Sequence, residues 1–172
     1  GWNLGNFRNL GARYVKFERA LDSLMPKSRR QNNAYYCQGW LTGSVGNKES
    51  VANAWKKWSG ATTIRGMMEK FARNRYTKLN LSSFWSHGTV EFRHHSGTFD
   101  YEKAECWIRF TRAMVEQADK REKLQGWKTG LETNKVSLTK LLTPMVKNGY
   151  LPKRVARFYK ARQTHFDTLR VS

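Results

Sequence analysis

The sequence lacks the features of a membrane or disulfide-rich protein. It has no uninterrupted apolar run of about 18 residues, the length that a membrane-spanning helix needs, and no opening segment typical of a secretion signal. We therefore expect no membrane association. The two cysteines, Cys37 and Cys106, lack the CxxC spacing of a zinc site and are too few for a disulfide framework. We expect buried thiols in the cytoplasm or another reducing intracellular compartment.

Motifs of common metal and nucleotide enzymes are also missing. The glycine-containing loop 42–47 lacks the GxxxxGK[ST] pattern that surrounds phosphates, so we interpret it as a connector. There is no HExxH pattern for zinc. We expect His87 to lie in a solvated turn, and His94 to be a hydrogen-bonded core histidine.

Acidic residues are scarce. The chain has 32 Lys and Arg against 13 Asp and Glu, which gives a formal charge of +19 and a pI near 10.3. Such an excess favours polyanionic partners, of which nucleic acid is the most common in a cell. With 172 residues, 39% of them apolar and 13% aromatic, we expect a single domain over residues 1–172 with a real core.

Helical periodicity recurs along the chain. The predicted helices span 6–24, 49–58, 64–71, 101–118, 138–145 and a final stretch after Pro152. Candidate caps precede three of them: Thr62 or Thr63, then Asp100, then Ser137. A short strand is predicted at 35–41. The final helix presents basic residues, which we interpret as a nucleic-acid-contacting face or, equally, as a solvated face: Lys153, Arg154, Arg157, Lys160 and Arg162.

One strand forms the centre of the site hypothesis. Residues 89–95 alternate so that Glu91, Arg93 and His95 share one face, spaced roughly 7 Å apart along the strand. If this strand pairs antiparallel with 79–81 across a connection at 82–87, Asn80 lies near Glu91 and Arg93. This face suits a metal, phosphate or carboxylate site, or it is a solvated sheet face whose charges neutralise each other.

These elements predict an α+β fold, in which an antiparallel hairpin around 76–96 packs with several amphipathic helices. In the predicted strand, Lys78, Asn80 and Ser82 face away from Leu79 and Leu81.

The central segment resembles the amidoligase family, relatives of glutamine synthetase and of carboxylate-amine ligases. The resemblance is strongest at Glu91-Phe92-Arg93 and extends from Ser28-Arg29-Arg30 to Tyr159 and Phe166. It implies part of a glutamine synthetase-like fold, and an ATP- and magnesium-dependent reaction that joins a carboxylate to an amine. It also implies catalytic roles for Glu91, as a magnesium ligand, and for Arg93, as a phosphate clamp.

Further binding residues complete the implied site. The substrate- or phosphate-binding candidates are Arg30, Asn80, His95 and Thr98. Members of this family begin with strands that contain a Gly-x-Glu-x-Glu metal motif and a His-rich strand, whereas this sequence opens at Gly1-Trp2-Asn3-Leu4. We therefore expect the C-terminal portion of a larger fold, with a second polypeptide supplying the missing N-terminal half. The alternative is a non-catalytic basic protein that binds DNA or RNA, or a structural component of a nucleoprotein assembly.

Overall fold

A computed structural model describes residues 1–30, 35–40, 60–71, 75–120 and 137–168. In chain order the elements are α1 (Leu4–Asp22), a 3-10 turn η1 (Lys27–Arg29), α3 (Ile64–Phe71), β1 (Leu79–Asn80), α4 (Ser83–His87), β2 (Glu91–Phe92), α5 (Tyr101–Asp119), α6 (Leu138–Lys147) and α7 (Lys153–Thr168). The chain thus has an α+β fold, and its two described strands form an antiparallel pair.

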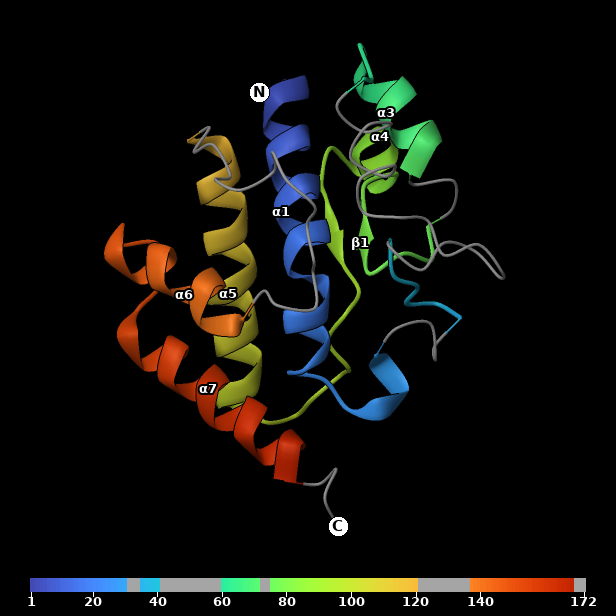
Figure 1. Cartoon of the computed structure of the whole chain (residues 1–172). Helices are drawn as coiled ribbons and strands as arrows, with labels where there is room; N and C mark the ends of the chain where they lie inside the picture. The colour runs from blue at the N-terminus through green and yellow to red at the C-terminus, as the bar shows by residue number, and fades with distance from the viewer. Residues whose placement is uncertain (31–34, 41–59, 72–74, 121–136, 169–172) are drawn as a thin grey trace.

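Helix α1 is the central element of the fold (Figure 1). Helices α5, α6 and α7 pack to one side of it, and the two strands with α3 and α4 lie on the other side. Apolar side chains such as Phe7, Leu10 and Leu21 are buried at helical spacing along α1, and polar ones such as Glu18 and Asp22 are buried as well. A helix in contact with neighbours on both sides buries more than one stripe, so α1 has few exposed residues.

Local sequence signals account for the helix ends. Asn3 caps α1, because its side-chain oxygen accepts from the backbone N–H of Gly5 at 2.9 Å. The predicted caps Asp100 and Ser137 accept from Lys103 and Lys140 at the starts of α5 and α6. Of the two candidates before α3, Thr63 is the one that accepts, from the N–H of Gly66. The predicted caps Thr63, Asp100 and Ser137 are thus confirmed, whereas Asn3 was not predicted.

The strands are shorter than the alternation predicts. The strand expected at 89–95 is reduced to β2, and the expected connection at 82–87 contains the short helix α4. Gly88, at φ +66°, ends α4 in the left-handed region. The expected strand at 35–41 is, over its described residues, one parallel bridge between Gln38 and Thr77. The predicted helix at 49–58 and the loop at 42–47 lie outside the described residues.

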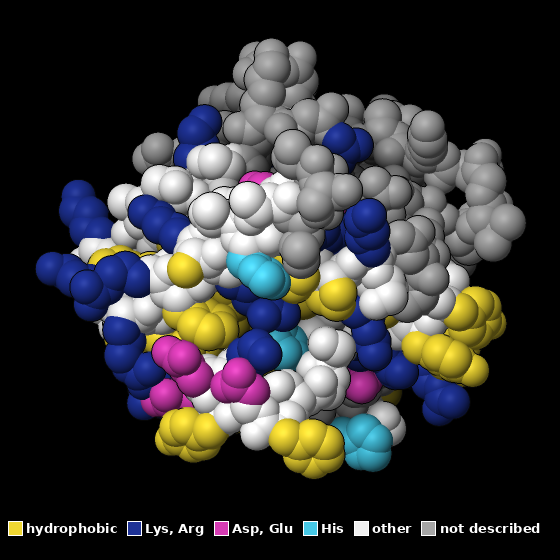
Figure 2. All heavy atoms as spheres, turned by 90° about the horizontal axis from the view of Figure 1, so that it is seen from below, with side chains coloured by type: hydrophobic (Ala, Val, Ile, Leu, Met, Phe, Trp, Pro, Cys, Tyr) yellow, Lys and Arg dark blue, Asp and Glu magenta, His cyan; other side chains and the backbone are white. Residues whose placement is uncertain are grey.

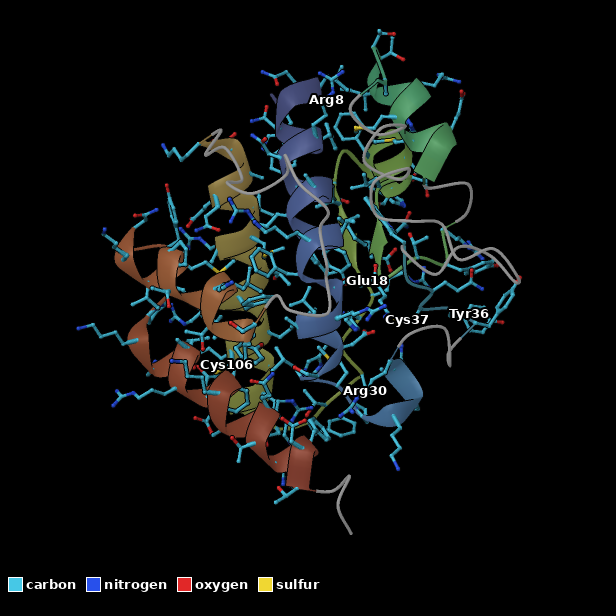
Figure 3. All side chains as sticks on the ribbon, in the orientation of Figure 1. Arg8, Glu18, Arg30, Tyr36, Cys37 and Cys106 are labelled. Carbon is cyan, nitrogen blue, oxygen red and sulfur yellow. The ribbon has the colours of Figure 1, made fainter. Side chains whose placement is uncertain are left out.

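Both cysteines are free and buried, as expected, and burial raises the pKa of each thiol. Cys106 lies on α5, and Cys37 lies on the strand side of α1 (Figure 3). None of the helices in the described ranges is long and apolar enough to span a membrane.

Candidate functional site

The hairpin brings together three of the predicted site residues. Asn80 on β1 is paired directly with Glu91 on β2, and Leu79 is paired with Phe92. Residues directly opposite each other project to the same side of the sheet, so Asn80 and Glu91 lie together. The backbone N–H of Arg93 donates to the carbonyl of Lys78 at 2.7 Å, which extends the pairing by one residue and places Arg93 beside this pair.

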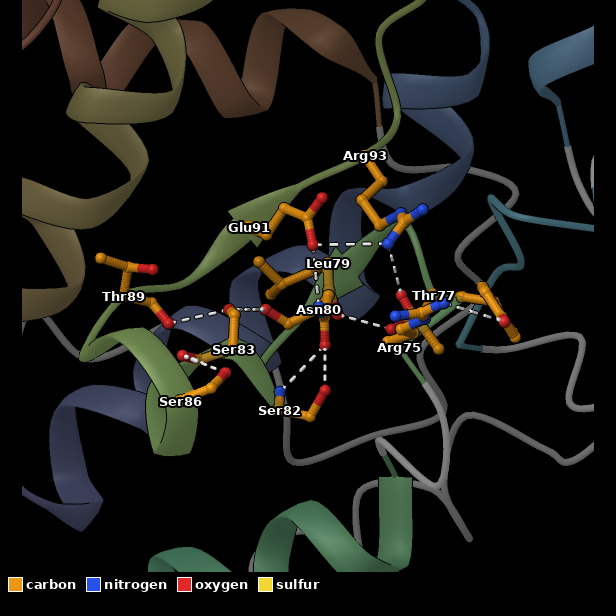
Figure 4. A network of polar contacts seen from close by, with 11 residues as sticks. Arg75, Thr77, Leu79, Asn80, Ser82, Ser83, Ser86, Thr89, Glu91 and Arg93 are labelled. Carbon is orange, nitrogen blue, oxygen red and sulfur yellow. Dashed lines mark hydrogen bonds and ion pairs between the residues drawn. The ribbon is translucent and has the colours of Figure 1, made fainter.

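A hydrogen-bond network orients these side chains (Figure 4). Asn80 Nδ2 donates to Glu91 Oε2 at 2.9 Å, and Arg93 Nη1 lies 3.4 Å from the same oxygen. Asn80 Oδ1 accepts from the N–H and the hydroxyl of Ser82 at 3.0 and 2.6 Å. Because Asn80 Oδ1 accepts both hydrogen bonds from Ser82, the amide nitrogen of Asn80 is the atom that faces Glu91. We call Asn80, Glu91 and Arg93 the Glu91 cluster.

The two charged residues of the Glu91 cluster are partly open to solvent and carry opposite charges, whereas Asn80 is buried. The side chain of Glu91 is 47% exposed and that of Arg93 is 24% exposed. The contacts of the carboxylate with Asn80 and Arg93 both use Oε2, so within the described part of the chain Oε1 has no polar partner. Arg93 Nη1 also donates to the carbonyl of Arg75 at 3.1 Å, which fixes the guanidinium at the edge of the cluster. The arrangement can accept a hard cation on Glu91 and an anion on Arg93.

The structure places His95 and Thr98 away from these contacts. His95 Nδ1 donates to the carbonyl of Ser96 at 2.5 Å, and its ring lies 5.1 Å from that of Trp107 on α5. Burial lowers the pKa of His95, and the nearby cations Arg162 and Lys103 lower it further. Thr98 Oγ1 accepts from the N–H of Asp100, one residue before α5 begins.

Arg30 lies at the end of α1, with Arg162 of α7. Arg30 Nε donates to the carbonyl of Met25 at 2.6 Å, and Arg162 Nε donates to that of Leu24 at 2.8 Å. Both guanidiniums lie over the ring of Phe166, at 5.3 and 4.8 Å from its centroid. The carbonyls of Leu24 and Met25 lie just after the C-terminal end of α1. The helix dipole is negative at that end, so cationic side chains bind there favourably. Arg30 is thus brought together with Arg162 rather than with Asn80 and Glu91.

A buried polar network, which the sequence analysis missed, joins α1 to the hairpin. Lys78 Nζ lies 2.5 Å from Asp22 Oδ1 and 3.8 Å from Glu18 Oε1, and its side chain is fully buried. His94 Nε2 lies 2.7 Å from the same Asp22 oxygen, and the hydroxyl of Tyr14 lies 2.9 Å from His94 Nδ1. We call these residues the buried network. The sequence analysis placed Lys78 on the face opposite Leu79 but did not predict its burial, which the two carboxylates of α1 make possible.

The pKa shifts define the protonation states in the buried network. Burial lowers the pKa of His94 to about 4, against the hydrogen bond to Asp22 that would raise it, so the ring is neutral at pH 7. Burial would raise the pKa of Asp22, but hydrogen bonds from His94 and Lys78 outweigh it and lower the pKa. An ionised Asp22 can only accept, so His94 carries its proton on Nε2 and accepts from Tyr14 on Nδ1. This confirms His94 as a hydrogen-bonded core histidine.

One sequence signal could have indicated the buried network. Tyr14, Glu18 and Asp22 follow each other at intervals of four, so they share one face of α1. Acids on a helix face that also includes buried Leu21 need a buried counter-charge.

The basic residues of the last helix divide between different partners. Arg154 pairs with Glu105 of α5, and Arg162 bonds to Leu24 as described above. Lys153, Arg157 and Lys160 instead line an open groove of about 470 Å³ between α6 and α7. In Figure 2, lysine and arginine side chains gather at the edge where α6 and α7 lie in Figure 1.

The groove combines an apolar floor with a basic rim. Its lining residues are Leu142, Thr143, Val146, Lys147, Lys153, Ala156, Arg157 and Lys160. No acidic residue is among them. We call this the α6–α7 groove.

Within the ranges that the structure describes, no group of three or more His, Cys, Asp or Glu residues could hold a metal ion. At the Glu91 cluster, the described residues offer the partly exposed carboxylate of Glu91 as a ligand for a hard cation.

The sequence profile of a family described as "Putative amidoligase enzyme" matches residues 2–115. The match includes α1, the hairpin and most of α5, and therefore the whole Glu91 cluster and the buried network; α6 and α7 lie outside it. No curated protein and no solved structure matches the chain.

Proposed function

The chain belongs to the putative amidoligase family, and on that premise we propose that it takes part in ATP- and magnesium-dependent formation of an amide from a carboxylate and an amine. The observation that supports this proposal is the exposed Glu91 cluster, an acid and a guanidinium held side by side within the matched residues.

The proposed reaction has two steps. A carboxylate oxygen of the substrate attacks the terminal phosphorus of ATP and displaces ADP, which gives an acyl phosphate. The amine nitrogen then attacks the acyl carbon, inorganic phosphate leaves with the former carboxylate oxygen, and the nitrogen loses a proton. The first step gathers negative charge on phosphoryl oxygens, so it requires fixed cations.

Residues of the Glu91 cluster have separate roles in this proposal. Glu91 binds magnesium through Oε1, while Asn80 holds Oε2 in place. Arg93 binds a phosphoryl oxygen, and its bond to the Arg75 carbonyl restricts where the guanidinium can point. Magnesium, when bound, neutralises charge on the phosphates.

We also propose that the other half of the ATP and metal site comes from a complementary polypeptide. Magnesium at phosphate-handling sites is held by one or two carboxylates together with substrate phosphates and water, and the described residues of the Glu91 cluster supply one partly exposed carboxylate, so a complementary chain would supply the second. In this view the chain is the C-terminal portion of a glutamine synthetase-like ligase.

Replacing Glu91 with Gln tests the catalytic proposal. The assay measures magnesium-dependent ATP turnover in the assembly isolated from its source, whose chains are identified by mass spectrometry. We expect turnover to fall about 100-fold or more, since a neutral amide cannot replace a metal-binding carboxylate at a charged transition state. Glu102→Gln removes the same charge from an exposed position on α5 and is the matched control. Unchanged turnover in Glu91→Gln would contradict the assignment.

A second candidate function is binding of DNA or RNA, and the α6–α7 groove favours it. Lys147, Lys153, Arg157 and Lys160 line the groove without an acid. This proposal makes the chain a basic component of a nucleoprotein assembly, and it does not require the Glu91 cluster to be catalytic.

A further inference from the structure

Beside the Glu91 cluster lies a group of tyrosines that no role described above uses. The rings of Tyr35, Tyr36 and Tyr76 contact one another, with all three centroid distances at 5.1 Å. Tyr35 is 62% exposed and Tyr36 is 59% exposed. Tyr36 projects away from the body of the molecule, at the edge of the view in Figure 3. We call these three residues the tyrosine platform.

Two arginines connect the tyrosine platform to the Glu91 cluster. The guanidiniums of Arg75 and Arg93 lie over the ring of Tyr76, at 5.3 and 5.9 Å from its centroid. Arg93 is also the residue that contacts Glu91 at 3.4 Å. The Arg93 guanidinium therefore contacts both the ring of Tyr76 and the carboxylate of Glu91, so a ligand lying across it would meet both groups.

The chemistry of this surface favours a ligand with a flat aromatic part and a negatively charged part. Exposed rings offer faces on which a nucleobase can stack, and such stacking is a main source of affinity in sites that bind bases without reading their edges. Guanidiniums beside the rings suit phosphate oxygens. A nucleoside triphosphate has both parts, joined through a ribose.

We propose that the tyrosine platform binds the base of a nucleoside triphosphate whose phosphates extend towards Arg75 and Arg93. This inference rests on the proposed ligase function, which requires ATP. It assigns the two exposed rings, Tyr35 and Tyr36, to base stacking, and it makes Tyr76 the residue that positions the arginines between base and metal.

The test compares ligands that share only one part of ATP. Titration calorimetry in the presence of magnesium measures binding of ATP, adenosine and inorganic triphosphate to the same intact assembly. Tyr36→Ala and Tyr35→Ala should weaken ATP binding by between about 5-fold and about 160-fold, which is the range for losing one stacking ring. They should leave triphosphate binding unchanged, because triphosphate has no base.

Two further variants separate stacking from loss of structure. Tyr36→Phe keeps the ring and should bind ATP as the unaltered chain does. Tyr101→Ala removes a tyrosine that is 80% exposed on α5, outside the platform, and should also have no effect.

The outcomes separate the two proposals. Equal ATP affinity in both alanine variants would overturn the tyrosine platform while leaving the ligase proposal standing. Tyrosine-dependent binding of adenosine together with unchanged ATP turnover in Glu91→Gln would support the platform and contradict the catalytic role of Glu91. Tyrosine-dependent binding of a single-stranded oligonucleotide without any binding of ATP would overturn the inference in favour of nucleic acid.

Discussion

At the residue scale, the buried network shows how charge can be placed inside this fold. Removing Lys78, Glu18 and Asp22 from water is costly, and the cost is offset only because the cation lies between two acids and because His94 and Tyr14 complete the hydrogen bonds. The network also links α1 to the hairpin. Through that link, the position of β2 and hence of Glu91 depends on residues that are buried beneath it.

The histidine of this network predicts how stability depends on pH. The pKa of His94 is about 4 in the folded chain against 6.5 in the unfolded chain. Between these values the unfolded chain binds a proton that the folded chain does not, so the free energy of unfolding falls as the pH is lowered from 6.5 to 4. The loss attributable to His94 is about 3 kcal/mol and is complete below pH 4. Urea unfolding at several pH values measures it.

Titration of the imidazole signals by NMR provides the control for this prediction. We expect the His94 ring to titrate near pH 4. Above that pH the neutral ring should show the Nε2–H tautomer, because Nε2 donates to Asp22. A His94 signal that titrates near 6.5 would contradict the burial argument.

Residue alternation identified the Glu91 cluster but not the buried network. Alternation places Asn80 and Glu91 on the same side once the two strands pair, and the pairing is as expected. It does not say which sides of a strand are covered. Leu79 and Asn80 are both buried, and so is Lys78, because other elements lie against both sides of β1. The acids that pair with Lys78 lie 56 and 60 residues earlier in the chain, and local pattern cannot predict such a contact.

At the scale of elements, α4 and its glycine determine how the chain enters β2. Gly88 adopts φ +66°, and the backbone N–H of Gly88 donates to the carbonyl of Phe84 at 2.9 Å. The sequence analysis expected only a connection at 82–87, with His87 in a solvated turn, and no helix there. Among the described residues, the glycines with positive φ are Gly88 and Gly149. A five-residue helix is too short for periodicity to reveal.

Replacing Gly88 with Ala should destabilise the protein by about 1 kcal/mol, because an L-residue with a Cβ is strained in the left-handed region. A Cβ at this position meets no atom within 4 Å, so the cost is conformational rather than steric. Chemical denaturation measures the change.

Gly97→Ala is the matched control for this prediction. Gly97 also has open space around its Cβ position, but its φ lies outside the strained range. We expect no loss of stability there, or a slight gain. Gly88→Asn should lose less than Gly88→Ala, since Asn tolerates the left-handed region. Equal losses in Gly88→Ala and Gly97→Ala would show that backbone conformation is not the cause.

At the scale of the whole molecule, the long helices were predictable and their assembly was not. Caps and periodicity define where α5 and α6 begin, because those signals lie within a few residues of the ends. The central position of α1 results from long-range packing against helices on one side and strands on the other. For the same reason the five basic residues predicted as one nucleic-acid face are divided: α5 pairs with Arg154, and the end of α1 pairs with Arg162.

The α6–α7 groove concentrates part of the +19 charge in one place, and this arrangement predicts how nucleic-acid binding responds to salt. Lys153, Arg157 and Lys160 lie on one face of α7 over about 10 Å, enough to face about three successive phosphates of one strand. Replacing all three with Gln should reduce the slope of log K against log salt by about 2 for single strands. Fluorescence anisotropy with a labelled oligonucleotide, from low to moderate salt, measures this slope.

A variant with the same net charge tests whether the groove or the total charge is responsible. Arg112, Lys120 and Lys140 are exposed and lie outside the groove lining, so replacing these three with Gln removes an equal charge. If phosphates bind in the groove, this control should keep most of the slope, because counterions are released where the backbone makes contact. An equal reduction in both variants would mean that the excess charge acts diffusely, and equal groove-dependent binding of polyglutamate would show that the groove does not select nucleic acid.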